Sequence, residues 1–462
     1  MSIKDDRKPD LRRTVLELLL DRSDYPTRRF SAAVQAAGLE SRDRGLAREL
    51  LGGVLRRAVQ LDAIYEPYCK KRVTDEAVRW TLRLGTLQLF FLSNVPEHAA
   101  VHATIQAARR YLRERTGFTH AVLRNLQRKS KAEEPFSAEF SRRRLTVGRR
   151  SWFFDRPIFH DPEKFPVEYH AQQLSFPPAM VRRWFDEVGE APALARMQAL
   201  GETPPLWIRV NLLRSSREAV HEQFKELGLE AELVEHPRFL LLRRPGREVS
   251  TLPGFAEGHW AVQDLTSFET VELGEPRAGE HVLDLCAAPG GKSFAVAELT
   301  EGKATILACD TDGDRLARLA PEAARLGHQI ETQVIDAESF GYPTLPVDLL
   351  ILDVPCTNTG VLHKRPEARD RFTKDELHRA TTVQNLIRKA VQKQYLGPDG
   401  PRPRVLWTTC SLEPEENEQM VARIAKQANY IVRAERRFEP DGQRAGGYAA
   451  ILEPATESEV SG

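Results

Sequence analysis

The sequence lacks the features that are typical of secreted, membrane-embedded and metal-stabilised proteins. Its 462 residues include only five cysteines, which form no CxxC pair, so a disulfide scaffold is excluded and a zinc knuckle is disfavoured. No apolar run approaches the roughly 20 residues that a membrane span needs, and the first residues contain no apolar signal segment. We expect a reduced, cytoplasmic, monomeric protein without a membrane anchor or a bound metal.

The composition is that of a globular protein with more than one domain. Glycine (28 residues) and proline (29 residues) are close to their background frequencies, which excludes collagen-like and low-complexity designs. Hydrophobic residues make up 41% of the chain and charged residues 29%, so sizeable cores can form. A chain of this length is long for one domain and suits two or three.

Positive charge is concentrated in the first part of the chain. Residues 1–130 contain 25 Lys and Arg against 15 Asp and Glu, whereas residues 169–462 contain 34 against 44. A basic block on a mildly acidic body favours a polyanionic partner that binds mainly at one end. Charge alone does not separate this interpretation from a solvated helical surface, because arginine is also a good helix former.

Apolar periodicity divides the chain into four parts. Residues 1–130 predict an all-α bundle, since apolar residues recur at helical spacing from residue 11 onwards without a strand pattern. Residues 131–176, dense in arginine and proline, are interpreted as a linker or insert. Residues 177–260 mix helices and strands and predict a small α+β module, whose clearest strand is 206–210.

Residues 261–457 alternate apolar strands with helices. This alternation predicts an α/β domain with a parallel, doubly wound sheet of the Rossmann-like class. Its predicted strands are 281–286, 304–310, 330–335, 347–353 and 404–409.

The first of these strands leads into a turn of small residues that opens a helix. The turn is formed by Cys286, Ala287, Ala288, Pro289, Gly290, Gly291 and Lys292. Small residues at a helix N-terminus let backbone N–H groups approach a ligand closely. A phosphate-binding P-loop would need glycine at the position of Cys286, so an NTPase is disfavoured.

Acidic residues follow the next two strands. Asp310 lies 19 residues after Gly291, where a carboxylate can bind both ribose hydroxyls of a nucleoside cofactor, and Asp336 follows the third strand near the expected adenine edge. Each acid taken alone could simply cap the following helix. A nucleoside that lies across the carboxyl ends of the first three strands accounts for the small-residue turn, Asp310 and Asp336 together.

The fourth and fifth strands each end near a cysteine. Asp353 and Cys356 follow one strand and Cys410 follows the next, so both thiols are expected near one crevice. A pyrimidine explains the need for a thiolate, because its addition to carbon 6 turns carbon 5 into a nucleophile that can take a methyl group. Asp353 beside the ring could hydrogen-bond the nitrogen and amino edge of the base.

These motifs resemble those of the Sun-type RNA (cytosine-5)-methyltransferases. The matching stretches are LDLCAAPGGK at 283–292, DVPC at 353–356 and TCSLEPEENE at 409–418. RDR at 42–44, LG at 84–85 and VPEHAAV at 95–101 resemble the NusB-like domain. In the ribosomal RNA small-subunit methyltransferase B branch this domain precedes the catalytic one.

The resemblance implies an S-adenosylmethionine-dependent enzyme that forms 5-methylcytosine in RNA. Cys410 is then the thiol that attacks carbon 6, and Cys356 helps to break the adduct. The implied cofactor contacts are Cys286 to Lys292, Asp310, Asp336 and Asp353, and Lys292 is also expected to approach the target ring. The family usually has Ser-Gly where this chain has Thr357-Asn358.

Small-subunit (16S) ribosomal RNA is the favoured target on this resemblance. A transfer RNA enzyme of the same family remains a rival, since no motif in the chain reads RNA sequence. From another class, the chain could be a non-catalytic RNA-binding scaffold in which the NusB-like domain does the work, although the presence of Cys410, Cys356, Asp353 and Asp310 together argues against it.

Overall fold

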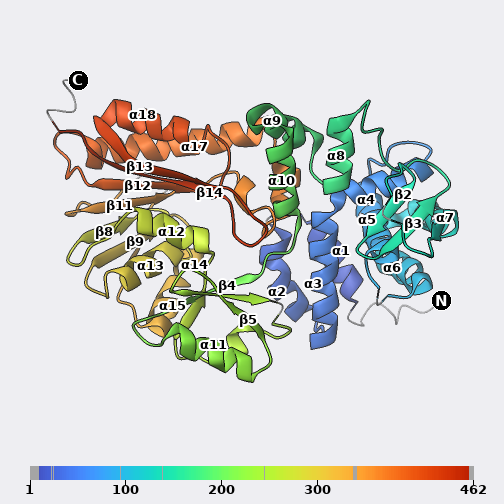
Figure 1. Cartoon of the computed structure of the whole chain (residues 1–462), viewed down its shortest axis with the longest axis horizontal. Coiled ribbons are helices and arrows are strands. Elements are labelled where there is room, and N and C mark those ends of the chain that lie inside the picture. Colours follow the sequence, from blue (N-terminus) through green and yellow to red (C-terminus); the bar gives the residue numbers. More distant parts are fainter. Residues whose placement is uncertain are drawn as a thin grey trace. The chain divides into compact units, whose positions relative to one another are not determined.

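The computed structural model describes residues 10–456, apart from residues 22, 24, 94, 138, 244 and 337–340. The described chain forms two compact units (Figure 1). The N-terminal unit contains the residues up to Gly201 together with Arg365–Asp370, and the C-terminal unit contains the remainder. None of the helices in the described part of the chain combines the length and the hydropathy of a membrane span.

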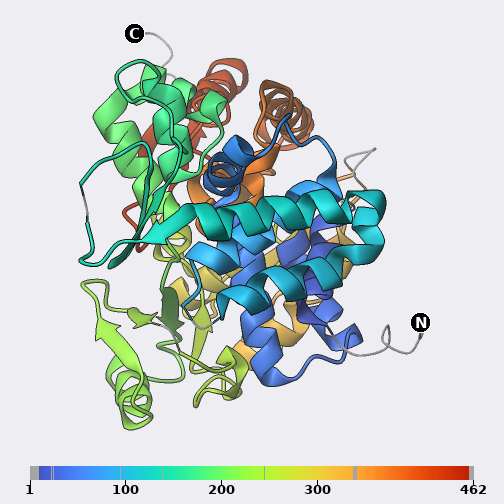
Figure 2. The same ribbon diagram turned by 90° about the vertical axis from the view of Figure 1, so that its right-hand side faces the viewer.

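Helices make up the first part of the N-terminal unit, which confirms the predicted all-α bundle. Their apolar faces share one core that includes Val15, Leu50, Leu84 and Leu126. The consecutive helices α6 and α7 form a hairpin and lie side by side (Figure 2). The helices are α1 (Leu11–Leu20), α2 (Pro26–Ala36), α3 (Ser41–Arg56), α4 (Ala58–Tyr65), α5 (Glu76–Phe90), α6 (Glu97–Leu112) and α7 (Thr116–Lys129), with short 3-10 turns η2 (Glu66–Tyr68) and η3 (Arg113–Arg115).

Residues 131–176, interpreted from the sequence as a linker or insert, carry regular structure. Three antiparallel strands in the order β1-β3-β2 are followed by a helix; they are β1 (Ser130–Ala132), β2 (Arg144–Val147), β3 (Arg150–Phe154) and α8 (Pro166–Leu174). Trp152 and Phe154 of β3 pack against Phe90 of α5, with ring centroids 5.6 and 5.4 Å apart. The segment therefore extends the helical core. Its strands are too short and too rich in arginine to give a clear alternating pattern.

The N-terminal unit also contains three helices that lie further along the chain. These are α9 (Pro178–Val188), α10 (Glu190–Gly201) and the short α16 (Glu367–Arg371), of which residues up to Asp370 belong to this unit. Arg369 of α16 is buried and donates to the backbone carbonyls of Arg56 (2.9 Å), Ser175 (3.2 Å) and Leu200. One arginine thus holds a segment that is distant in sequence within this unit.

The C-terminal unit begins with a small antiparallel sheet of four strands. The strand order is β5-β6-β4-β7, and α11 packs its buried Val220 and Phe224 against the sheet. The elements are β4 (Leu206–Val210), α11 (Arg217–Glu226), β5 (Glu230–Leu233), β6 (Phe239–Arg243) and β7 (Trp260–Val262). β4 coincides with the predicted strand 206–210.

The larger sheet of this unit has seven strands in the order β10-β9-β8-β11-β12-β14-β13. The first five are parallel and match the five predicted strands, whereas β14 runs antiparallel to β12 and β13. The sheet is therefore mixed rather than wholly parallel. The strands are β8 (His281–Asp284), β9 (Thr305–Asp310), β10 (Glu331–Val334), β11 (Leu349–Asp353), β12 (Arg404–Thr409), β13 (Tyr430–Phe438) and β14 (Gly447–Pro454).

Helices cover both faces of this sheet, which confirms the Rossmann-like class. In Figure 1, α12 and α13 lie on one face and α17 and α18 on the other, each burying apolar side chains against the strands. The helices are α12 (Leu265–Leu273), α13 (Gly291–Leu299), α14 (Gly313–Leu316), α15 (Leu319–Leu326), α17 (Lys374–Val391) and α18 (Glu418–Ala428). Because the five parallel strands share a direction, their carboxyl ends meet at one edge of the sheet.

Candidate functional site

The turn between β8 and α13 is shaped by one glycine. Gly290 has φ +107°, and a Cβ at this position would lie 2.6 Å from the ring of Phe294 and 2.8 Å from Leu319. Only glycine fits there, and the residue lets the chain enter α13 directly after the strand. The N–H groups in the first turn of α13 have no acceptor within their own helix, so they are available to a ligand.

Asp310, the acid predicted to bind ribose, lies at this turn. One carboxylate oxygen accepts the backbone N–H of Ala288 (2.9 Å) and the other accepts that of Asp312 (2.9 Å). These bonds tie the carboxylate to the turn and to the loop after β9, whereas the helix that follows is capped by Asp312, whose side chain accepts from the backbone N–H of Arg315. Each oxygen keeps a further lone pair, so the carboxylate can still accept from a hydroxyl. Asp336 lies two residues beyond β10 and is exposed.

Acidic side chains surround the turn. Burial raises the pKa of the Cys286 thiol well above its ordinary value, and the carboxylates of Asp284, Asp310 and Asp353 raise it further. Asp284 is itself buried, which raises its pKa to about 7. One of its oxygens accepts from Ser293 (2.8 Å), and the other has no hydrogen-bond partner among the described residues. The carboxylate of Asp310 and the other acidic side chains beside this turn disfavour a triphosphate, whose negative charge they would repel.

Both predicted thiols lie together at the sheet edge. Cys356 follows β11, Cys410 follows β12, and their Sγ atoms are 3.3 Å apart. The bond to Cys410 and burial raise the pKa of Cys356 well above its ordinary value. A neutral thiol thus stands beside a second thiol, which allows the two to have different roles.

A charged pair stands near the thiols. Lys292 Nζ donates to Asp353 Oδ2 at 2.6 Å. Burial lowers the pKa of Lys292, but the attraction of Asp353, Asp284 and Cys410 exceeds this effect, and the net pKa is raised. Lys292 is therefore an ammonium at neutral pH, and it attracts negative charge on Cys410.

Asn358 links the loop after β11, which carries Cys356, to the loop after β12, which carries Cys410. It adopts a left-handed conformation (φ +61°), its Oδ1 accepts from Cys410 Sγ at 3.3 Å, and its Nδ2 donates to the carbonyl of Cys356 at 2.7 Å. Asparagine tolerates this region of φ better than most residues. The departure from the usual Ser-Gly therefore keeps the backbone conformation and adds an acceptor for the Cys410 thiol.

Replacing Asn358 by glycine removes its bond to Cys410 together with its bond to the carbonyl of Cys356, without straining the backbone. We expect Asn358→Gly to fold normally and to lower the rate of the thiol-dependent step about 2- to 12-fold, the equivalent of one neutral hydrogen bond of ~0.5–1.5 kcal/mol. Single-turnover kinetics with saturating substrate measure this rate. An unchanged rate would show that the carboxamide does not orient the nucleophile.

A buried carboxylate also connects the loop after β11 with the loop after β12. Glu416 accepts the backbone N–H of Thr357 (3.0 Å), the side chain of Gln384 (2.9 Å) and the hydroxyls of Thr357 and Ser411. Burial raises its pKa above the ordinary carboxyl value. Thr357 lies next to Cys356 and Ser411 lies next to Cys410, so Glu416 fixes the spacing of the thiols.

The structure brings most of the predicted site residues together. The turn from Cys286 to Lys292, Asp310, Asp353, Cys356 and Cys410 all lie at the carboxyl edge of the parallel strands. Asn358, Glu416 and Gln384 were not assigned roles from the sequence. Glu416 lies within the PEENE stretch, but nothing in that pattern shows that its carboxylate is buried against another loop.

Comparisons with known proteins give family matches along most of the chain. Residues 10–128 match the NusB family, residues 176–249 match the RsmF/B-like ferredoxin-like domain, and residues 271–458 match the family described as 16S rRNA methyltransferase RsmB/F. The chain is 30% identical to a probable ribosomal RNA small subunit methyltransferase B of Synechocystis, with 87% of this chain and 85% of the relative covered. It is also 30% identical to the ribosomal RNA small subunit methyltransferase B of Cronobacter sakazakii, with 83% and 82% covered.

Two solved structures share the fold. PH0851 superposes with a TM-score of 0.74 at 21% identity over 97% of this chain and 98% of that one. NSun6 from Pyrococcus horikoshii, crystallised with the S-adenosylmethionine analogue SFG, superposes with a TM-score of 0.55 at 21% identity over 61% of this chain and 99% of that one.

Fold, site and comparisons together define the class: the protein is an S-adenosylmethionine-dependent RNA methyltransferase. More particularly, the chain belongs to the ribosomal RNA small subunit methyltransferase B family, and its N-terminal helical domain is NusB-like.

The position of Asp310 makes a prediction for cofactor binding. Asp310→Ala is expected to weaken the binding of S-adenosylmethionine by about 1.5–3 kcal/mol, because the variant can neither form charge-assisted hydrogen bonds to the ligand nor anchor Ala288. Isothermal titration calorimetry measures the change, with Asp314→Ala as an exposed acidic control on α14. Equal affinities for wild type and Asp310→Ala would rule out this assignment.

Proposed function

We propose that the protein methylates carbon 5 of a cytosine in small-subunit ribosomal RNA through a covalent adduct between Cys410 and carbon 6 of the base. The observation that carries this proposal is the pair of thiols 3.3 Å apart beside the Lys292–Asp353 ion pair. A single nucleophilic thiol would suffice for addition. A second thiol in contact with the first suits a reaction in which the adduct must also be broken.

In this proposal Cys410 is the nucleophile. Asn358 orients its sulfur, and the Lys292 ammonium attracts the thiolate form. When the thiolate adds to carbon 6, negative charge develops on the ring, and Asp353 with its bound Lys292 is proposed to hydrogen-bond the polar edge of the base. Carbon 5 thereby becomes the nucleophilic carbon.

S-adenosylmethionine supplies the methyl group that carbon 5 accepts. The residues that would hold it are the turn from Cys286 to Lys292, Asp310, Asp336 and Asp353. After transfer, the proton on carbon 5 passes to solvent water, its bonding electrons restore the double bond between carbons 5 and 6, and the bond between Cys410 and carbon 6 breaks with the electron pair on sulfur. Cys356 is proposed to assist this release, since it is a protonated thiol in contact with the departing sulfur.

The choice of RNA rests on the relatives and on the N-terminal unit. The similar proteins are named for the small subunit of the ribosome, and the basic NusB-like domain suits a polyanionic substrate. Bisulfite sequencing of ribosomal and transfer RNA from a deletion strain and its parent tests the proposal. We expect a protected cytosine in 16S RNA that disappears in the deletion strain and returns with the wild-type gene. A protected site that disappears only from transfer RNA would reassign the substrate, and an unchanged pattern would contradict the cytosine-5 activity.

A further inference from the structure

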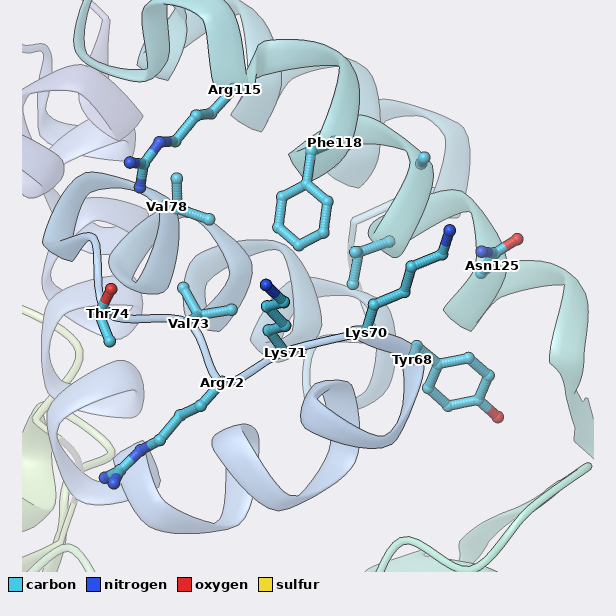
Figure 3. A pocket seen from close by; sticks show the side chains of 12 residues that line it. Tyr68, Lys70, Lys71, Arg72, Val73, Thr74, Val78, Arg115, Phe118 and Asn125 are labelled. Carbon is cyan, nitrogen blue, oxygen red and sulfur yellow. The ribbon is translucent and has the colours of Figure 1, made fainter.

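The NusB-like domain contains a pocket that the proposed chemistry does not use (Figure 3). One wall is the loop from Tyr68 to Thr74, and the other is α7 from Phe118 to Asn125 with the preceding Arg115. Its volume of about 570 Å³ lies within the range of ~300–1,000 Å³ found for pockets that hold small ligands. The pocket is therefore large enough for a small molecule or for a single monomer of a bound polymer.

An exposed aromatic ring lies inside this pocket. Phe118 projects from α7 toward the opposite loop and is 42% exposed (Figure 3). The buried side chains of Val73, Val78 and Val122 line the pocket around it. An exposed phenyl ring over an apolar floor offers a face on which a planar group can stack, and bases stack on such rings without regard to sequence.

Positive charge surrounds the ring. Lys70, Lys71 and Arg72 line the loop wall and are exposed, and Arg115 lies at the rim. Within the described residues, Lys70 and Lys71 have no hydrogen bond or ion pair, and no Asp or Glu lines the pocket. Free ammonium groups beside an aromatic platform are the combination that binds single-stranded nucleic acid.

A second hollow continues this surface. It shares Arg115 with the first pocket and is also lined by Arg110 and Arg113. Its acids are partly neutralised, since Asp75 pairs with Arg115 at 3.0 Å. The two hollows therefore adjoin at Arg115.

We propose that this pocket binds one unstacked nucleotide of single-stranded RNA, with its base on Phe118 and its phosphates on Lys70 and Lys71. This inference rests on the proposed function in one respect, which is that the ligand is taken to be the substrate RNA. The pocket then holds the substrate at a point within the N-terminal unit, whereas the residues that perform the chemistry belong to the C-terminal unit.

Binding of fluorescein-labelled oligouridylate to the full chain, followed by anisotropy, tests the stacking of the base. Phe118→Ala is expected to weaken binding about 5- to 150-fold, which corresponds to the ~1–3 kcal/mol of one stacked base. Phe118→Tyr keeps a stacking face and is expected to retain the affinity. Phe136→Ala is the matched control, because Phe136 is also 42% exposed but lies outside the pocket.

The role of the lysines is tested by salt dependence. In the double variant Lys70→Gln, Lys71→Gln, the slope of log affinity against log salt is expected to fall by about 0.7 for each phosphate that is no longer neutralised. A variant with Lys225→Gln and Lys303→Gln removes two exposed lysines from the other unit and is expected to keep the wild-type slope.

These results separate the pocket from the chemistry. If Phe118→Ala and the lysine variant both keep the wild-type affinity and salt slope, the proposed RNA-binding role of the pocket is wrong, whatever the bisulfite result. Weaker binding in both would support it even if no methylcytosine were found. Should Phe118→Ala fail to fold, Phe118→Leu keeps an apolar side chain without a ring, and its wild-type affinity would overturn the stacking. Binding of an acidic polypeptide that depends on the lysines but not on Phe118, and displaces the RNA, would overturn the choice of ligand.

Discussion

Cys410→Ala is expected to abolish methylation and to form no covalent species, whereas Cys356→Ala is expected to accumulate a covalent protein–RNA adduct. Removal of the nucleophile stops the reaction before any bond to RNA forms, with a fall in rate on the order of 10⁴-fold or more. Removal of the releasing thiol leaves attack and methyl transfer possible but leaves the adduct intact. A denaturant-resistant shifted band on a gel with radiolabelled RNA measures the adduct.

Cys69→Ala is the matched control, because Cys69 is another free thiol but lies in the N-terminal unit and does not line the pocket described there. It is expected to behave as wild type in both assays. An adduct in Cys410→Ala and none in Cys356→Ala would exchange the two roles. Full methylation by both variants, with no adduct in either, would show that neither thiol takes part.

The parallel strands and their ends could be predicted because burial makes them conspicuous. Strands covered on both faces read as short apolar runs, and the five that were predicted from residue 281 to residue 409 are β8 to β12. Ligands in such folds bind at the carboxyl ends of the strands. Polar residues and cysteines that directly follow these runs were therefore identifiable as site residues.

The last two strands could not be read in the same way. β13 carries charged side chains along its middle and lies at the sheet edge, and β14 contains small residues that suit a helix as well as a strand. The small sheet between residues 130 and 154 packs on Phe90, a residue distant in sequence, through Trp152 and Phe154 of β3. Such long-range packing leaves no local periodicity.

The interactions that fix the positions of the two thiols could not be predicted from the sequence either. Asn358 stood out only as a departure from the usual Ser-Gly, and its bond to Cys410 depends on a left-handed backbone in one loop and the position of another. The acceptor role of Glu416 depends on Thr357, which lies 59 residues earlier in the chain. The residues that react were predictable from the sequence, whereas those that position them became evident from the structure.

Replacement of Glu416 by leucine is expected to lower the free energy of unfolding by about 2–6 kcal/mol. Leucine accepts no hydrogen bond, so the backbone N–H of Thr357 and one N–H of Gln384 remain buried and unpaired, at ~1–3 kcal/mol each. Urea denaturation measures the change. Because burial raises the pKa of Glu416, the folded state favours its protonated form, and this stabilising contribution decreases as the pH rises from the ordinary carboxyl pKa through the raised value. The destabilisation on substitution should therefore be larger in acid than at neutral pH.

The same substitution separates a structural role from one in positioning the thiols. If Glu416 fixes the spacing of the loops, adduct formation in a Cys356→Ala background should slow in Glu416→Leu under conditions where the protein is still folded, and Glu416→Gln, which keeps one acceptor oxygen, should recover part of the rate. Glu301→Leu is the control, since Glu301 is exposed, pairs only with Lys303 in the described structure, and should change stability by no more than ~1 kcal/mol. Wild-type stability together with an unchanged adduct rate in Glu416→Leu would mean that the thiols keep their separation without this carboxylate.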